Sequence, residues 1–320
     1  MKIVIFNVSA ALSAYVEFGN RKVVIDLGKS GDFSPVNDFL LPLFRKRERD
    51  NNPLEPKPKQ ECYTIDQLII SHPHKDHLSD IQDFDKYFNP ILLTTPNAKD
   101  TDSELNINWS HITTPDDEDV LYLKNMMANR NPPLTVTDPY KMTLAYLYPK
   151  AVEDDATLDT ESYTNNVSLA VYINDRYSIL FPGDLQKEGM KALLNGTTKN
   201  KQGKMLKNKL QTFGVDFLVT PHHGLRSSFS TALFDAIKGH KTHKLNIVPE
   251  KPTTEDDARQ VDSRYASTDY CEAVNNLSTK DSPVCQRKTS NGHIYIDDDG
   301  NVHVESDINE ILKYFNQPVE

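Results

Sequence analysis

Residues 63–77 read YTIDQLIISHPHKDH, an apolar run followed directly by three histidines and an aspartate. The run has the length and composition of a buried strand. Imidazole and carboxylate groups are costly to place at the end of such a strand unless they have a partner. A metal ion, a proton relay and chance are the explanations that this segment leaves open.

The spacing of these residues favours metal binding. His72 and His74 are two positions apart, and side chains with that spacing point to the same side of an extended segment, so both imidazoles can share one ion. Asp76 and His77 follow where the chain turns, and they can offer an oxygen and a nitrogen to a second ion. Imidazole and carboxylate ligands suit Zn, Mn or Fe rather than Ca.

Two other predicted strands end in residues of the same kind. The segment SILFPGD (178–184) ends in an aspartate, and DFLVTPHHG (216–224) ends in two adjacent histidines. Loops at one end of the strands of an α/β fold converge on a single cleft, so we expect these side chains to meet. One late histidine then serves as a ligand, with His223 slightly favoured over His222, and the other can protonate a leaving group. The predicted metal ligands are His72, His74, Asp76, His77, Asp184, His222 and His223, and Asp76, His222 and His223 are also the predicted catalytic residues.

The rest of the chain alternates between predicted strands and helices. This order predicts an α/β fold with two mixed sheets and helices outside them, in one domain over residues 1–320 with an insertion at about 97–162. The predicted elements are strands at 3–8, 14–18 and 23–25 with a turn at Gly19-Asn20, an exposed charged loop at 44–61, a strand at 63–71, a helix at 79–88 capped by Ser79, a strand at 91–96, a helix near 116–130, a strand near 141–148, a hairpin at 167–184, a strand from 216, a helix at 227–238, a strand at 244–249 and a hairpin at 290–304.

Composition excludes several classes of protein. The net charge of −10 argues against a protein that binds nucleic acid or anionic membrane with its whole surface. The lysine-rich segment 187–209 could still guide nucleic acid locally. No apolar run is long enough to predict a membrane span. Cys62, Cys271 and Cys285 are too few and too widely spaced for a disulfide framework, so we expect buried, inert thiols and a cytoplasmic location.

The segment HPHKDH resembles the HxHxDH signature of the metallo-β-lactamase fold. In this resemblance Asp26 matches the early strand-end aspartate, Asp184 the metal-bridging aspartate, and His223 or His222 the late histidine. It covers about residues 3–304 and is similar above all to the ComEC-like branch, the hydrolase domain of bacterial DNA-uptake proteins. The segments that carry this likeness are NNVSLAVYI, LFPGDL, VTPHHGLRSS and SNGHIYIDDDGNVHV, in that order.

The resemblance implies an αββα four-layer sandwich with two divalent metal ions and phosphodiester hydrolysis by a metal-activated hydroxide. One departure concerns residues 163–166, YTNN, where the family commonly has a further histidine that the ComEC-like branch tends to lack. The ion bound by His72 and His74 then has fewer histidine ligands, so we expect Mn as readily as Zn. The predicted substrate contacts are Asn165 and Asn166, together with Ser227 and Ser228 at an expected helix start.

We therefore expect a metal-dependent hydrolase of phosphodiesters, a nuclease acting on DNA or RNA. Hydrolysis of a small nucleotide or another ester is the first alternative, because one fold hosts many chemistries. The second alternative is a non-catalytic metal-binding module that contacts protein partners in a multi-component bacterial system. Activity on a panel of substrates separates the nuclease from a hydrolase of small nucleotides or other esters. Retained metal without turnover favours the non-catalytic module.

Overall fold

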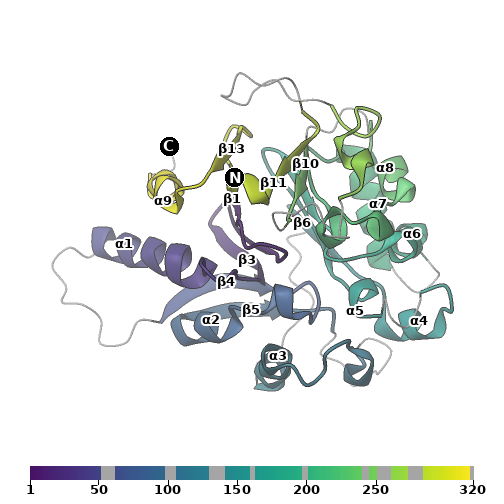
Figure 1. The fold of residues 1–320 in the computed structure, drawn as a ribbon, viewed down its shortest axis with the longest axis horizontal. Helices are drawn as coiled ribbons and strands as arrows, with labels where there is room; N and C mark the ends of the chain where they lie inside the picture. Colours follow the sequence, from purple (N-terminus) through teal and green to yellow (C-terminus); the bar gives the residue numbers. More distant parts are fainter. Residues whose placement is uncertain are drawn as a thin grey trace.

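The computed structural model describes residues 1–51, 62–97, 106–129, 141–158, 163–196, 201–239, 245–250, 261–272 and 284–317 of the 320-residue chain. Its strands form two mixed sheets, and helices lie on the outer side of each (Figure 1). The predicted α/β class and the αββα layering are confirmed.

The first sheet contains seven of the described strands. Its order is β13, β12, β1, β2, β3, β4, β5, and only the β3–β4 and β4–β5 pairs are parallel. The antiparallel opening and the final hairpin of the chain are therefore confirmed. The strands are β1 (Lys2–Ile5), β2 (Ser13–Phe18), β3 (Arg21–Leu27), β4 (Tyr63–Ile69), β5 (Phe88–Thr94), β12 (His293–Ile296) and β13 (Val302–Glu305).

The second sheet contains six of the described strands, in the order β11, β10, β9, β8, β7, β6. The pairs β8–β9, β9–β10 and β10–β11 are parallel, whereas β6–β7 and β7–β8 are antiparallel. The parallel pairs matter for the site, because parallel neighbours deliver their following loops to the same edge. The strands are β6 (Met142–Ala145), β7 (Ala170–Asn174), β8 (Ser178–Phe181), β9 (Phe217–Val219), β10 (Leu245–Val248) and β11 (Gln286–Lys288).

Alternation along the strands explains how both faces of each sheet are buried. On β1, Ile3 packs in the cluster between the two sheets, whereas its neighbour Val4 packs in the cluster beneath the helices. The same split occurs on β8, where Ile179 faces the other sheet and Leu180 faces the helices. Strands covered on both faces read as continuous apolar runs, which is why the sequence pattern identifies them.

The helices cover the two outer faces. In Figure 1, α1, α2 and α9 lie beside the first sheet, and α6, α7 and α8 lie beside the second. The described helices are α1 (Leu41–Asn51), α2 (Ile81–Tyr87), α3 (Glu118–Asn129), α4 (Pro149–Asp154), α5 (Tyr163–Asn166), α6 (Lys187–Asn195), α7 (Lys201–Phe213), α8 (Thr231–Ala236) and α9 (Ile308–Phe315).

The prediction of a loop over 44–61 is wrong for its first part, which belongs to α1. Arginine, lysine and glutamate are good helix formers, Pro42 lies in the first turn of the helix, and the next proline comes only at Pro53. Leu43 and Phe44 bury their side chains under the helix, and each burial contributes about 1.5–3 kcal/mol. Residues 52–61 of the predicted loop lie outside the described part of the chain.

Two predicted helix starts are also corrected. The first residue of α2 is preceded by Asp80, while the hydroxyl of Ser79 accepts a hydrogen bond from the Lys29 backbone N–H at 2.8 Å. The helix predicted from 227 begins as α8 only at Thr231, after a separate 3₁₀ turn at Arg226–Ser228. Both helix starts depend on hydrogen bonds that the serine hydroxyls make elsewhere in the fold. Helix propensity along the sequence does not report these contacts.

The cysteine prediction is wrong. Cys271 and Cys285 are buried and joined by a disulfide, with Cα atoms 5.6 Å apart. Cys62 is a free, exposed thiol rather than a buried one. The pairing depends on the fold bringing two residues together that are 14 positions apart, which their spacing alone does not reveal.

The expected insertion at about 97–162 contains residues 98–105, 130–140 and 159–162, which the structure does not describe. Its described part includes α3 and β6, and β6 pairs with β7 over four residues. That strand therefore belongs to the second sheet. Among the described helices, none has both the length and the hydropathy that crossing a bilayer requires.

Candidate metal centre

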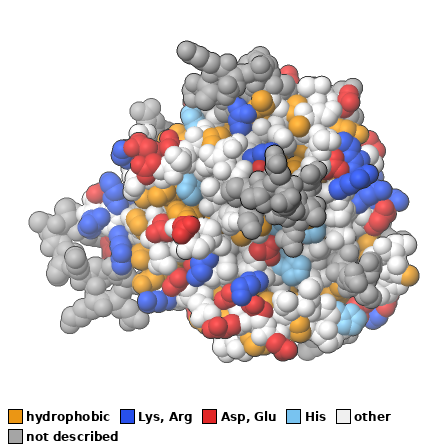
Figure 2. All heavy atoms as spheres, in the orientation of Figure 1, with side chains coloured by type: hydrophobic (Ala, Val, Ile, Leu, Met, Phe, Trp, Pro, Cys, Tyr) orange, Lys and Arg blue, Asp and Glu red, His pale blue; other side chains and the backbone are white. Residues whose placement is uncertain are grey.

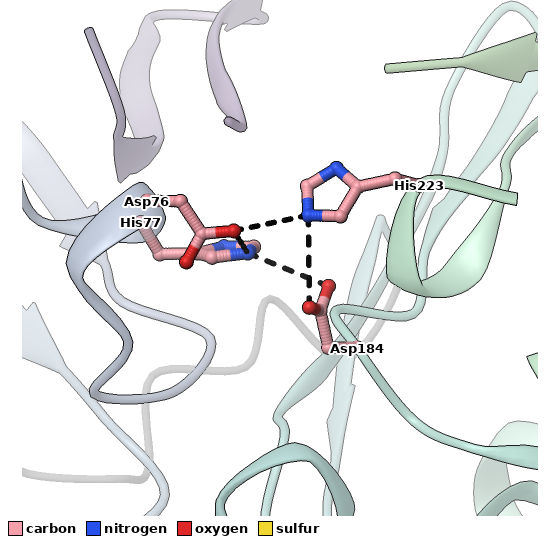
Figure 3. Close-up of side chains that lie close together, drawn as sticks. All are labelled: Asp76, His77, Asp184 and His223. Carbon is pink, nitrogen blue, oxygen red and sulfur yellow. Dashed lines mark hydrogen bonds and ion pairs between the residues drawn. The ribbon is translucent and has the colours of Figure 1, made fainter. Parts of the chain in front are cut away.

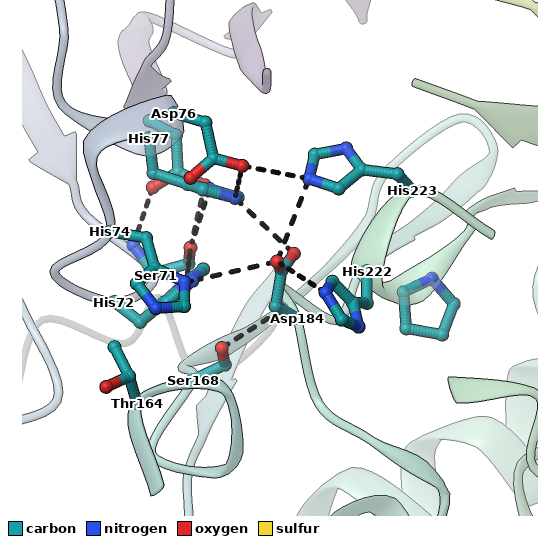
Figure 4. Close-up of polar contacts among 12 residues, drawn as sticks. Ser71, His72, His74, Asp76, His77, Thr164, Ser168, Asp184, His222 and His223 are labelled. Carbon is teal, nitrogen blue, oxygen red and sulfur yellow. Dashed lines mark hydrogen bonds and ion pairs between the residues drawn. The ribbon is translucent and has the colours of Figure 1, made fainter. Parts of the chain in front are cut away.

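The ligand-type residues lie in loops that follow three strands, β4, β8 and β9. The segment after β4 provides His72, His74, Asp76 and His77, the loop after β8 provides Asp184, and the loop after β9 provides the two late histidines. Strands from both sheets therefore bring these side chains together. Asp184 lies at its centre, with ring nitrogens from both halves of the molecule around it (Figure 4).

Four residues form the first group, which we call the four-residue cluster. They are Asp76, His77, Asp184 and His223, and one ligand atom from each lies within 4.8 Å of all the others. Figure 3 shows their polar atoms directed toward one another across the space between the two sheets. The Nε2 of His223 is 3.1 Å from an oxygen of Asp76, and the Nε2 of His77 is 3.4 Å from an oxygen of Asp184.

The second group, the three-residue cluster, consists of His72, His74 and Asp184. The Nε2 of His72 lies 3.0 Å from the Nδ1 of His74 and 3.7 Å from an oxygen of Asp184. The Nε2 of His74 in turn lies 3.3 Å from the hydroxyl of Thr113. Asp184 is therefore the residue that the two clusters share, as expected for a bridging ligand.

The distances fit ligands around an ion better than they fit hydrogen bonds. Asp184 oxygens lie 3.4 to 3.9 Å from ring nitrogens of His72, His77, His222 and His223, longer than good hydrogen bonds. Ligand atoms about 2.1 Å from one tetrahedral ion lie about 3.4 Å apart. Moreover, the Nε2 of His77 is buried without a hydrogen-bond partner. An orphaned imidazole nitrogen beside two carboxylates is the fit expected of a divalent cation site.

A layer of buried groups behind the ligands sets the orientation of two histidines. Asp26 accepts hydrogen bonds from the backbone N–H and the hydroxyl of Ser71, both at 2.7 Å, and lies 2.8 Å from the Nδ1 of His77. Since the Ser71 hydroxyl is donated to Asp26, its oxygen is free to accept from the Nδ1 of His72 at 3.0 Å. With an ion bound, both histidines would carry their proton on Nδ1 and direct a lone pair on Nε2 into the site.

Sequence reasoning named Asp26 by resemblance but missed Ser71 and Thr113. Ser71 immediately precedes the histidine motif, so its position at the end of a buried strand was the available signal. Thr113 follows β5 at a distance in sequence, and nothing in its surroundings pointed to the site. Only the packing of its segment places its hydroxyl beside His74.

The electrostatics of the centre favour a cation. Burial opposes charge on His77, but the nearby carboxylates of Asp184 and Asp26 outweigh it and raise its pKa well above the ordinary value. Burial would raise the pKa of Asp184, yet the surrounding histidines, His77 first, hold that pKa well below its usual range. The Asp184 carboxylate therefore stays ionised in the buried site, where it favours positive charge nearby.

His72 behaves differently from His77. Burial keeps the pKa of His72 well below its ordinary value, and the nearby His77 acts in the same direction. His72 is thus a neutral imidazole, the form in which a histidine binds a metal. Burial likewise lowers the pKa of His74 and of His222.

The backbone around the site adopts costly conformations. Of the described non-glycine residues, four have positive φ, namely Ser9, Asp26, His222 and His223, with φ between 46° and 62°. Ser9 and the two histidines line the cavity, and Asp26 supports His77. Such conformations cost about 1–3 kcal/mol each and persist where function needs a particular side-chain direction.

The centre opens into a cavity of about 1140 Å³. Its walls include His74, Asp76, Asp184, His222 and His223, together with loop residues from the first sheet such as those at 29–31. Figure 2 shows histidine side chains beside acidic ones in the lower middle of one face of the molecule. The candidate ligands that line the cavity are therefore reachable from solvent, whereas His72 and His77 are fully buried behind them.

The late histidines are placed differently. His223 belongs to the four-residue cluster, whereas His222 belongs to neither cluster and its Nε2 lies 3.9 Å from Asp184. The Nδ1 of His222 lies 3.5 Å from the hydroxyl of Ser227. The geometry therefore favours His223 as the ligand and leaves His222 on the cavity wall.

The other predicted substrate contacts are largely engaged within the protein. Ser228 is fully buried and donates to the carbonyls of Pro221 and Leu225. Asn166 is buried, and its side-chain oxygen accepts from the backbone N–H of Gln186. Asn165 is 7% exposed, and its side-chain oxygen has no hydrogen-bond partner.

No family model matches the chain, and no curated protein matches it. Among solved structures, the chain is similar to a protein from Thermotoga maritima described as a "putative metallo-beta-lactamase", with 13% identity and a TM-score of 0.31. The likeness covers 66% of this chain and 86% of that protein. The two mixed sheets with helices on both outer faces are consistent with a metallo-β-lactamase-like fold.

Proposed function

We propose that the protein is a metal-dependent hydrolase that cleaves phosphodiester bonds, with DNA or RNA as its substrate. The observation that carries the proposal is the pair of clusters that share Asp184 at an open cavity. Two divalent ions held there would supply Lewis-acid activation of water and of phosphoryl oxygens. Zn and Mn both suit this donor set.

Each protein group then has a stated task. Asp76, His77 and His223 would hold one ion with Asp184, and His72 and His74 would hold the other with the same carboxylate. His222 lines the cavity without being needed as a ligand, so it can pass a proton to the leaving oxygen. The neighbouring Ser227 hydroxyl holds the His222 ring in place.

The proposal extends to the ComEC-like branch and to a role in a multi-component bacterial system with a protein partner. Its support is the order of motifs in the sequence together with the ligand arrangement. A basic surface also supports a polyanionic substrate. The lysines of α6 and α7 gather at the right-hand edge in Figure 2, and α7 contains no acidic residue. Lys199 of this lysine-rich segment lies outside the described residues.

The test is cleavage of end-labelled single-stranded DNA and of bis(4-nitrophenyl) phosphate by the purified protein with Mn or Zn added. We expect cleavage of both substrates and its loss in the Asp76→Ala variant, because that change removes a ligand of the four-residue cluster. The matched control is Asp299→Ala, which removes an exposed carboxylate at the turn between β12 and β13 and should leave cleavage intact.

Equal background rates in the wild type and in Asp76→Ala would overturn the proposal. Cleavage of bis(4-nitrophenyl) phosphate without cleavage of DNA would redirect the assignment to small phosphodiesters. Bound metal without any turnover would leave the non-catalytic module as the explanation.

A further inference from the structure

A second, smaller pocket adjoins the metal centre. It has a volume of about 420 Å³ and is lined by Arg226, Val261, Asp262, Ser263 and Arg264. Val261 also lines the large cavity, so the two spaces share a wall. The two arginines make this the one described pocket that adjoins the metal centre and has guanidinium groups on its surface.

The backbone ties this pocket to the late histidines. Leu225 and Val261 form an antiparallel bridge, and the N–H of Asp262 donates to the carbonyl of Gly224 at 2.9 Å. Arg226 follows His223 by three residues, so their Cα atoms are no more than about 11 Å apart. A ligand with one phosphate at the metal centre therefore needs only a short extension to reach the smaller pocket.

Arg226 has spare binding capacity. Its side chain is exposed and makes no hydrogen bond or ion pair with any residue that the structure describes. A guanidinium carries five N–H donors in a planar fork that matches phosphate oxygens. Arg226 lies next to a candidate phosphodiesterase centre, and no described residue holds it by a hydrogen bond or ion pair, so it is available to an anionic ligand.

Arg264 is held rigidly beside it. Its Nε and one terminal nitrogen donate to the two oxygens of Asp262 at 2.9 and 2.7 Å, and its guanidinium carbon lies 3.8 Å above the ring of Phe229. Asp262 neutralises one of the two arginines, so the set retains a single positive charge. The remaining N–H groups of Arg264 and the exposed hydroxyl of Ser263 complete a set of donors.

We propose that Arg226, Ser263 and Arg264 form a second phosphate subsite, which holds a phosphate of a single-stranded nucleic acid near the one at the metal centre. The inference rests on the proposed phosphodiesterase function and gives its substrate a chemical class, a chain with repeated phosphates. A diester without a further phosphate leaves this subsite empty.

The test measures binding of fluorescein-labelled oligothymidylate to the full chain in chelator by fluorescence anisotropy, over a range of salt concentrations. We expect Arg226→Gln to weaken binding by about tenfold and to lower the slope of log K against log salt by about 1, because one phosphate contact is lost. Arg226→Glu should weaken it further. Neither variant removes a hydrogen bond or ion pair between Arg226 and a described residue, so both should fold.

The matched control is Arg49→Gln, which removes an exposed arginine on α1, on the other side of the first sheet. It should leave affinity and slope unchanged. An Arg226→Gln variant that binds as the wild type does, or a wild type that does not bind, would overturn the subsite. Metal-dependent cleavage of bis(4-nitrophenyl) phosphate by the wild type reports separately on the proposed function.

Discussion

The four-residue and three-residue clusters share Asp184 but are built differently. The four-residue cluster takes Asp76 and His77 from the segment after β4 and His223 from the loop after β9, so it joins both halves of the molecule. The three-residue cluster takes both of its histidines from one short segment. The residues just before β7 contribute no histidine to this cluster. The hydroxyl of Thr164 lies 3.1 Å from that of Thr113, which in turn contacts His74.

The two clusters also differ in how far their buried polar atoms are hydrogen-bonded without an ion. In the three-residue cluster, His72 and His74 contact each other at 3.0 Å, within hydrogen-bond distance. In the four-residue cluster, the buried Nε2 of His77 makes no hydrogen bond and has only longer contacts to carboxylates, 3.4 Å to Asp184 and 3.8 Å to Asp76. A buried donor or acceptor without a partner costs about 1–3 kcal/mol, so an ion relieves more in the four-residue cluster. We infer that this cluster binds the first and tighter ion.

The largest effect is expected from Asp184→Asn, because this change damages both clusters together. Losing the shared carboxylate should remove both ions and lower turnover of bis(4-nitrophenyl) phosphate by about a thousandfold or more, a loss of at least about 4 kcal/mol. Metal content by mass spectrometry of the purified protein measures the binding. Asp235→Asn, an exposed position on α8, is the control. A variant that retains one ion would contradict a shared ligand.

A smaller, asymmetric effect is expected from His77→Ala compared with His74→Ala. Calorimetric titration of the metal-free wild type with Zn should give two binding events. His77→Ala should abolish the tighter event, since it removes one of the two imidazoles of the four-residue cluster, whereas His74→Ala should weaken only the second. Equal losses of the first event in both variants would show that the clusters do not fill in this order.

The smallest effects concern the groups behind the ligands, one for each cluster. Asp26→Asn keeps a residue that tolerates positive φ but removes the charge that orients His77, so it should weaken the tighter event by about 10- to 100-fold. Thr113→Ala removes one hydrogen bond to His74, so it should weaken the second event by less than about tenfold. The same titration measures both. A reversed order would contradict the assignment of Asp26 to the tighter site.

Much of the fold follows from local pattern. The strands buried on both faces read as apolar runs, and Gly19-Asn20 marks the turn between β2 and β3. The errors fall where tertiary packing outweighs local signals. Charged residues after Leu43 form α1 because that helix has a sheet to cover, and Ser79 caps no helix because its hydroxyl is used by Lys29.

The sequence alone determined the ligands that lie close together along the chain. The spacing of His72, His74, Asp76 and His77 identified them as a group, but β4 ends at Ile69. His72 lies in a bend and Asp76 and His77 in a 3₁₀ turn, so strand alternation does not set their directions. The same local logic identified Asp184 and the histidine pair as strand-end residues.

Only the tertiary structure decided which of these groups meet and what supports them. The choice of His223 over His222, the Asp26–Ser71 layer, the contact of Thr113 with His74 and the pairing of Cys271 with Cys285 all join residues that the chain order does not relate. Such contacts arise from the packing of whole sheets and loops, and packing depends on shape in three dimensions rather than on spacing in sequence.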